Sequence, residues 1–172
     1  STCEPSPNFE IIDKFIAISE YKGIEPVIAV TKIDLDKYAE IQKIYSAAGI
    51  KVLLIDYTNE NCCDEIKHIL SGKLSAFTGN SGVGKSTLLN HINNSLGLET
   101  NEISKKLGRG KHTTRQVALY ETGGGYIADT PGFSTFETNK YDIIYKEELA
   151  GCFREFSDYI GKCRFQDCSH TK

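Results

Sequence analysis

The feature that most constrains the fold of this chain is a glycine-rich segment, Gly-Asn-Ser-Gly-Val-Gly-Lys-Ser, at residues 79–86. It fits the pattern G-x-x-x-x-G-K-[ST] and lies between a predicted strand, residues 74–77, and a predicted helix that begins at Lys85. Glycines allow the backbone to curl so that several N–H groups face one anion, and the following helix adds its positive end. The segment therefore predicts a site for nucleotide phosphates.

Apolar residues in the rest of the chain alternate between helical spacing and short continuous runs. Helices are predicted after Asn8, which is a good N-cap, and over residues 38–48, 66–70 and 85–93. Strands are predicted at residues 27–30, 52–55, 74–77, 117–120 and 126–128, with a glycine turn at 123–125 between the last two. This alternation favours a three-layer α/β fold of the P-loop NTPase class, a mostly parallel sheet with a hairpin at its edge.

A second motif, Thr31-Lys32-Ile33-Asp34, follows the predicted strand at 27–30 and fits [NT]-K-x-D. A carboxylate only accepts hydrogen bonds, and guanine presents two adjacent donors where adenine presents none in the same arrangement. Asp34 therefore predicts a preference for guanine of about a hundredfold or more, since each charge-assisted bond contributes about 1.5–3 kcal/mol. The aliphatic part of Lys32 is expected to lie along the base.

Two further segments complete the expected site. Asp129-Thr130-Pro131-Gly132 fits D-x-x-G, with Asp129 expected near Mg²⁺ and the Gly132 N–H near the γ-phosphate. The segment at 108–114 contains Thr113 and Thr114, of which Thr113 is the preferred Mg²⁺ ligand beside Ser86. Five basic residues between 105 and 115 predict a local contact with phosphate, of the nucleotide or of RNA. The alternative for these charges is a solvated loop.

The order of the motifs is unusual, because the base-reading motif precedes the phosphate loop by about 50 residues. Such a permutation leaves the loops in place when the original termini lie close together. This order, with Gly-Arg-Gly-Lys-His-Thr-Thr and Asp-Thr-Pro-Gly-Phe as written, closely resembles the circularly permuted ribosome-biogenesis GTPases of the RsgA/YjeQ type from residue 7 to residue 170. The chain is therefore expected to be a circularly permuted P-loop GTPase.

The resemblance implies GTP hydrolysis in late maturation of the small ribosomal subunit, stimulated by that subunit and involving contact with its rRNA. It also implies an OB-fold domain before the GTPase body and a zinc domain after it. His112 matches the family's switch histidine, which is proposed to take part in hydrolysis together with Lys85 and Thr113. Phe133 occupies the place where many GTPases carry a water-orienting Gln. The alternative is a guanine-nucleotide switch with negligible hydrolysis; an ATP-using enzyme is a third hypothesis, against which Asp34 argues.

The resemblance also assigns the remaining site residues. Cys163, Cys168 and His170 match three of four zinc ligands, and the fourth is expected beyond Lys172. Asp56 and Tyr57 replace the small residues whose backbone usually meets guanine. The boundary between the permuted GTPase domain and the start of the zinc domain is placed at residue 140, giving domains 1–140 and 141–172. The full set expected to bind nucleotide is Thr31, Lys32, Asp34, Asp56, Tyr57, Gly79, Asn80, Ser81, Gly82, Val83, Gly84, Lys85, Ser86, Thr87 and Gly132.

Composition sets the remaining expectations. A net charge of −3 argues against a chain-wide nucleic-acid surface, and no apolar run reaches the roughly 18 residues of a membrane span. The adjacent pair Cys62-Cys63 and the absence of a secretory pattern favour free thiols in a cytoplasmic protein. His68 and His91 are expected to be surface or packing residues. We also expect a monomer, and the absence of Met predicts an internal segment of a longer protein.

Overall fold

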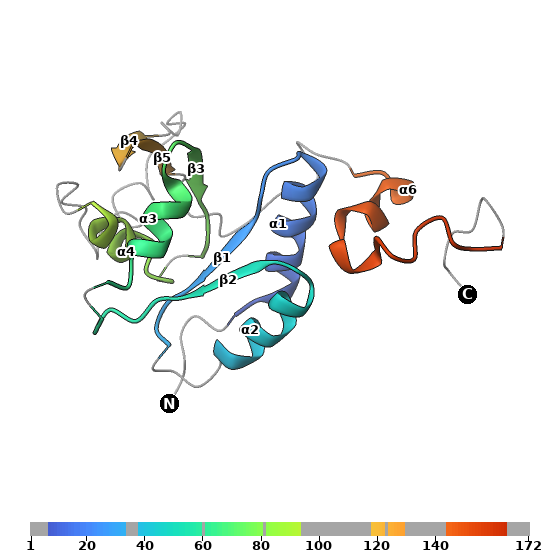
Figure 1. Ribbon diagram of the computed structural model, residues 1–172, viewed down its shortest axis with the longest axis horizontal. Helices are drawn as coiled ribbons and strands as arrows, with labels where there is room; N and C mark the ends of the chain where they lie inside the picture. The colour runs from blue at the N-terminus through green and yellow to red at the C-terminus, as the bar shows by residue number, and fades with distance from the viewer. Residues whose placement is uncertain are drawn as a thin grey trace, which may run out of the picture. The chain divides into compact units, whose positions relative to one another are not determined.

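The computed structural model describes residues 7–33, 38–59, 61–80, 82–93, 118–122, 124–129 and 144–164 (Figure 1). The chain divides into two compact units. The first contains residues 55–136 with residues 1–5, and the second contains residues 6–54 with residues 137–172. Each unit is described by itself.

The second unit begins with two helix–strand pairs. Helix α1 (Phe9–Tyr21) is capped by the Asn8 side chain, which accepts a hydrogen bond from the Ile11 N–H at 3.1 Å. Strand β1 (Val27–Val30), helix α2 (Tyr38–Ala47) and strand β2 (Lys51–Leu54) follow, and the two strands pair in parallel. Gly49 has a φ of +76° where α2 ends, a conformation that favours glycine.

The core of this unit lies between the two helices and one face of the strands. Ile16 of α1 contacts Ile41 and Tyr45 of α2, and Ile50 joins them in front of β2. The strand side chains that pack against this cluster are Ile28, Val30 and Val52. Ile28 and Val52 are register partners, so they point to the same face of the pair. Burial of this apolar surface holds α1 and α2 against the strands.

The C-terminal segment of the second unit packs on α1. It comprises α6 (Lys146–Leu149) and two single 3₁₀ turns, η2 (Ala150–Cys152) and η3 (Arg154–Phe156). The Arg154 guanidinium pairs with Glu20 of α1 at 2.6 Å and donates to the Gly49 carbonyl at 2.7 Å. Tyr21 donates to Glu148 at 3.2 Å. Arg154 therefore contacts α1 and the turn between α2 and β2 with one side chain.

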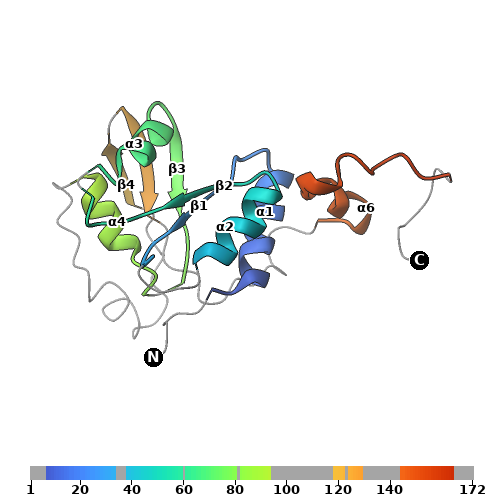
Figure 2. The same cartoon turned by 60° about the horizontal axis from the view of Figure 1, so that its bottom comes forward.

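Within the described residues, the first unit contains a three-stranded sheet and two helices (Figure 2). Its elements are α3 (Asp64–Leu70), β3 (Leu74–Phe77), α4 (Lys85–Ile92), β4 (Ala118–Thr122) and β5 (Gly125–Asp129). Strand β5 is central, parallel to β3 and antiparallel to β4. Its Ile127 is fully buried, as is Leu89 of α4 at 1% exposure, whereas Leu74 and Tyr126 lie on the opposite, exposed face.

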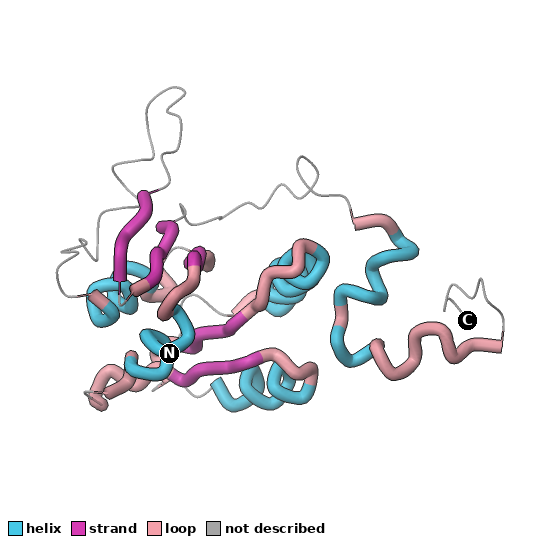
Figure 3. Tube along the Cα trace, turned by 45° about the horizontal axis from the view of Figure 1, so that its top comes forward, coloured by secondary structure: helices cyan, strands magenta, loops and turns pink. Residues whose placement is uncertain are grey.

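The strands and helices expected from the sequence are all present within the described residues. Figure 3 shows helices and strands along the Cα trace. Strand β2 begins one residue earlier than predicted, at Lys51, because an exposed lysine satisfies strand pairing without contributing to an apolar run. The predicted hairpin is confirmed as β4–β5, at the edge of the sheet. No helix in the described ranges combines the length and apolarity that crossing a bilayer requires.

Substitution of Gly125 is expected to destabilise the first unit. A Cβ at this position would overlap the carbonyl oxygens of Leu70 and Lys73, and both belong to backbone that cannot move aside easily. We expect Gly125→Ala to lower the free energy of unfolding by about 1–3 kcal/mol, the usual cost of overpacking. Gly151→Ala, where a Cβ would meet nothing within 4 Å, is the matched control. Equal urea midpoints for the two variants would contradict this packing.

Candidate functional site

The loop between β3 and α4 has the curled backbone expected of a phosphate site. Gly79, Gly82 and Gly84 have φ values of +154°, +82° and +93°, conformations that disfavour side-chain-bearing residues. A Cβ on Gly79 would lie only 3.1 Å from Val83 Cγ2. Gly84 is the N-cap of α4 and offers no side chain to its N-terminal N–H groups. A side chain of the N-cap residue therefore does not compete with an anion for these groups.

The Lys85 side chain folds back across this loop. Its Nζ donates a hydrogen bond to the carbonyl oxygen of Gly79, at the other end of the motif, and the side chain is half-buried. Ser86 and Thr87 follow in the first turn of α4 and are also half-buried. An ammonium group beside a ring of backbone donors, with a hydroxyl next to it, fits a phosphate group and the Mg²⁺ that accompanies nucleotides.

The sheet register brings the backbone of Asp129 to the same edge as this loop. Asp129 is the last residue of β5, and its Cα partner is Phe77, the last residue of β3. The phosphate loop begins two residues after Phe77. Because the two strands are parallel, their carboxyl ends lie together, as the sequence predicts for a ligand site in such a sheet. The side chain of Asp129 lies outside the description.

The base-reading motif starts with an unusual backbone. Thr31 and Lys32 follow β1 in the second unit, and Lys32 has a φ of +56°. A lysine in the left-handed region costs about 1 kcal/mol or more, and such conformations cluster at functional sites. Lys32 is the second residue after the strand. Asp34 lies outside the described residues.

The Asp56 carboxylate is engaged by its own turn. Its Oδ1 accepts hydrogen bonds from the backbone N–H of Thr58 at 2.9 Å and from the Thr58 hydroxyl at 2.7 Å. These bonds, the hydroxyl first, lower the pKa of Asp56 below its usual value. The charge that stands where the family pattern has a small residue therefore stabilises an Asx turn.

Tyr57 links this turn to the phosphate-loop helix, a contact that the sequence analysis did not predict. The rings of Tyr57 and His91 lie 4.4 Å apart between centroids and are tilted by 36°. The His91 ring is oriented by a 2.8 Å hydrogen bond between Nδ1 and the Thr87 carbonyl, so Nδ1 is the donor. His91 is thus a packing residue, as expected, with a definite partner. No sequence pattern joins residues so far apart, and only the fold reveals the pair.

Several predicted residues lie outside the described part of the chain. These are Asp34, Ser81, His112, Thr113, Gly132, Cys168 and His170. Cys163 is described and is exposed. Among the described residues, no three His, Cys, Asp or Glu side chains are grouped so as to hold a metal ion.

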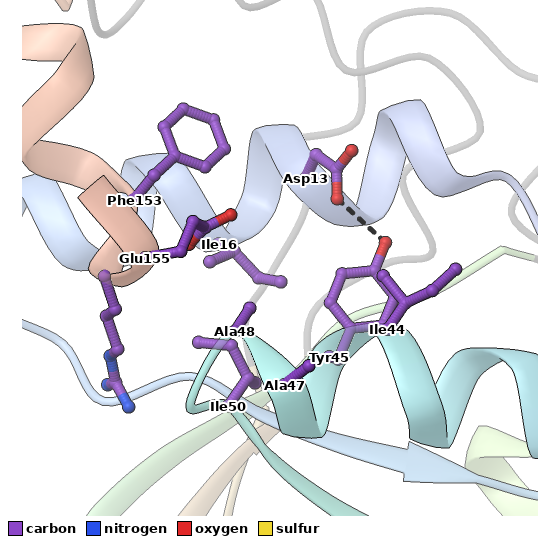
Figure 4. Close-up of a pocket in the computed structure, with 10 residues that line it drawn as sticks. Asp13, Ile16, Ile44, Tyr45, Ala47, Ala48, Ile50, Phe153 and Glu155 are labelled. Carbon is purple, nitrogen blue, oxygen red and sulfur yellow. Dashed lines mark hydrogen bonds between the residues drawn. The ribbon is translucent and has the colours of Figure 1, made fainter.

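A cavity of about 350 Å³ lies in the second unit, away from these motifs (Figure 4). Ile16, Ile50 and Phe153 provide apolar walls, and Asp13 lies on its rim. The Asp13 carboxylate accepts a hydrogen bond from the Tyr45 hydroxyl at 2.8 Å. Burial is the main cause that raises the pKa of Tyr45, and this hydrogen bond is the second. None of the predicted site residues lines the cavity, so it is a packing gap between helices rather than the nucleotide site.

Comparison with known proteins agrees with the motifs. The family model described as "RsgA GTPase" matches residues 1–139. A small ribosomal subunit biogenesis GTPase RsgA from Clostridium beijerinckii is 42% identical over 98% of this chain and 58% of its own length. The RsgA of a Streptococcus pyogenes serotype M6 strain is 45% identical over 99% of the chain and 57% of its own length.

Solved structures extend the likeness to the fold. YjeQ from Thermotoga maritima superimposes with a TM-score of 0.71 at 32% identity, covering 99% of this chain and 57% of that one. YloQ, whose title calls it a circularly permuted GTPase, superimposes with a TM-score of 0.72 at 31% identity, covering 99% of this chain and 54% of that one. The fold is therefore the predicted permuted GTPase fold, and the chain spans a little over half the length of these relatives.

Substitutions at two tyrosines, Tyr57 and Tyr45, test whether their hydroxyl groups have hydrogen-bond partners. Among the described residues the Tyr57 hydroxyl is buried without a hydrogen-bond partner, and burial raises the pKa of Tyr57 to about 12. Tyr57→Phe removes that hydroxyl and is expected to leave the free energy of unfolding unchanged or to raise it by up to about 1 kcal/mol.

The matched control is Tyr45→Phe, which breaks the hydrogen bond to Asp13 and is expected to cost about 1.5 kcal/mol. Urea denaturation measures both. Equal losses for the two variants would mean that the Tyr57 hydroxyl has a partner.

Proposed function

This chain belongs to the RsgA GTPase family, and on that premise we propose that it binds GTP and GDP and hydrolyses GTP. The two relatives described above are named small ribosomal subunit biogenesis GTPases, which supports a role in late maturation of that subunit. We propose that the subunit and its rRNA are the partner and that they stimulate hydrolysis. The protein acts in the cytoplasm as a monomer.

The observation that carries this proposal is the backbone of residues 79–85. Three glycines at positive φ curl the loop, and the Lys85 ammonium bonds across it to Gly79. On binding, the phosphate oxygens take over the hydrogen bonds of the loop N–H groups and of Lys85. Fixed donors that face the transferring group stabilise its charge without reorganisation.

The remaining roles follow the motifs. Ser86, Asp129 and Thr113 hold Mg²⁺, which when bound neutralises charge on the β- and γ-phosphates. The Gly132 N–H donates a hydrogen bond to the γ-phosphate. His112 orients the attacking water or accepts a proton from it, because Phe133 has no polar group that could do so. Asp34 accepts two hydrogen bonds from guanine, and it follows the left-handed Lys32 by two residues. The backbone of Asp56 and Tyr57 contacts the guanine base.

A zinc site and a domain boundary complete the proposal. Cys163, Cys168 and His170 bind Zn²⁺ with a fourth ligand beyond Lys172, in a domain that starts near residue 141. The exposure of Cys163 leaves its sulfur accessible to a metal. Residues 1–140 form the GTPase domain.

The Phe at position 133 favours one alternative, a guanine-nucleotide switch without useful hydrolysis. Phosphate release from GTP, measured with and without small ribosomal subunits, separates the two. We expect slow release alone and an increase of about 10³-fold or more with subunits, the range seen when a partner completes a GTPase site. Large subunits at equal concentration are the control. If small subunits do not change the rate of phosphate release, a nucleotide switch without useful hydrolysis is the function.

The assignment of Asp34 is tested by nucleotide preference. We expect the protein to bind GDP about a hundredfold or more tightly than ADP, because ADP leaves the Asp34 carboxylate unpaired. Asp34→Asn should weaken the binding of GDP and strengthen the binding of xanthosine diphosphate, because the C2 carbonyl of xanthine requires a hydrogen-bond donor. Asp158→Asn removes the same charge at an exposed position and should change neither affinity. An unaltered ranking of the three nucleotides in Asp34→Asn would refute the assignment.

A further inference from the structure

Two adjacent thiols lie beside the loop that carries Tyr57. Cys62 and Cys63 are both free, and their sulfur atoms lie 3.5 Å apart, in hydrogen-bonding contact. Cys63 is buried, with 3% of its surface exposed, whereas Cys62 is half-buried and within reach of solvent. The pair therefore has one accessible sulfur and one enclosed sulfur already in contact with it.

The pKa values of two buried groups at the pair are raised. Burial, followed by the hydrogen bond with Cys62, raises the pKa of the Cys63 thiol to about 11. The Tyr57 hydroxyl, buried and without a partner among the described residues, is close enough for both thiols to raise its pKa further. The catalytic and binding roles assigned above use neither cysteine.

We propose that Cys62 and Cys63 form a modification site for low-molecular-weight disulfides, which convert the pair to a reversible vicinal disulfide. The proposal is independent of nucleotide binding. It rests on the contact between the two sulfur atoms and on the unequal access of solvent to them.

The reaction balances with one disulfide oxidant, RSSR. The Cys62 thiolate attacks one sulfur of RSSR, the S–S bond breaks, and the first RS⁻ leaves and takes the proton that Cys62 lost. The Cys63 sulfur then attacks Cys62 Sγ in the mixed disulfide, and the second RS⁻ leaves with the Cys63 proton. The two cysteines are oxidised by two electrons and RSSR is reduced to two RSH.

The order of attack follows from access. Cys62 meets the oxidant first because its sulfur is the more exposed of the two. Cys63 is shielded from a bulky disulfide by its burial, and its raised pKa lowers the fraction of reactive thiolate. Cys63 therefore acts as the resolving thiol.

The product is expected to be easily reduced. Consecutive Cα atoms lie about 3.8 Å apart, which is shorter than the roughly 4.4–6.8 Å between Cα atoms in ordinary disulfides. A strained disulfide has a higher reduction potential than a structural one, so thiols reverse it readily. This distinguishes a labile modification from a permanent cross-link.

Peptide mass spectrometry tests the proposal directly. The protein is treated with oxidised glutathione, unfolded, alkylated and digested with trypsin. Cleavage after Lys51 and Lys67 releases residues 52–67, which contain Cys62 and Cys63 and no other cysteine. We expect this peptide to lack the mass of two hydrogen atoms and to take no alkyl group, and we expect mild thiol treatment to restore two alkylation sites.

Variants test the order of attack. Cys63→Ser should trap one glutathione on Cys62, because no resolving thiol remains, and Cys62→Ser should leave Cys63 unmodified in the folded protein. Cys152→Ala is the control, since it removes a buried thiol that has no assigned role and no adjacent cysteine, and it should leave the 52–67 result unchanged. Circular dichroism checks the fold, and Cys63→Ala replaces Cys63→Ser if serine unfolds the chain.

The wild-type result decides the proposal without any variant. If peptide 52–67 carries two glutathiones, or stays fully reduced after the treatment, the vicinal disulfide is refuted. If Cys62→Ser reacts at Cys63 as fast as the wild-type pair reacts, the assignment of Cys62 as the attacking thiol is refuted.

Discussion

The hydrogen bond from the Lys85 ammonium to the Gly79 carbonyl organises the phosphate loop. It spans a loop in which three glycines have positive φ, and it joins the lysine at the start of α4 to the first glycine of the motif. A cation and a set of N–H groups held at one point in advance need little rearrangement to receive phosphate. The Phe77–Asp129 pairing brings the end of β5 to the same edge.

The contact of Tyr57 with His91 gives this phosphate loop a second support. It connects the turn after β2 to helix α4, whose first turn contains Lys85 and Ser86. Hydrogen bonds fix both partners, on one side the Asx turn at Asp56 and on the other the His91–Thr87 contact. The turn proposed to contact the guanine base and helix α4, proposed to bind the phosphates, therefore pack against each other within one unit.

Local patterns in the sequence were sufficient to predict most of this fold. Each predicted strand is present because its apolar run or glycine turn is a property of consecutive residues, and Asn8 caps α1 as its type and position suggest. The curled loop followed from its glycines in the same way. Contacts between distant residues were not predictable: Tyr57 with His91, and Arg154 with Glu20 and Gly49, depend on how elements pack and carry no periodic signal. The left-handed backbone at Lys32 was missed because lysine rarely adopts it.

The contacts of Arg154 have a mechanical consequence. One guanidinium holds α1 through Glu20 and the end of α2 through Gly49, and the same helices pack on the strand that leads into Thr31 and Lys32. Residues 144–164 are thus fastened to the half of the protein that begins the base-reading motif. Loss of the Arg154 guanidinium would therefore release two contacts at once, the ion pair with α1 and the hydrogen bond to the turn that leads into β2.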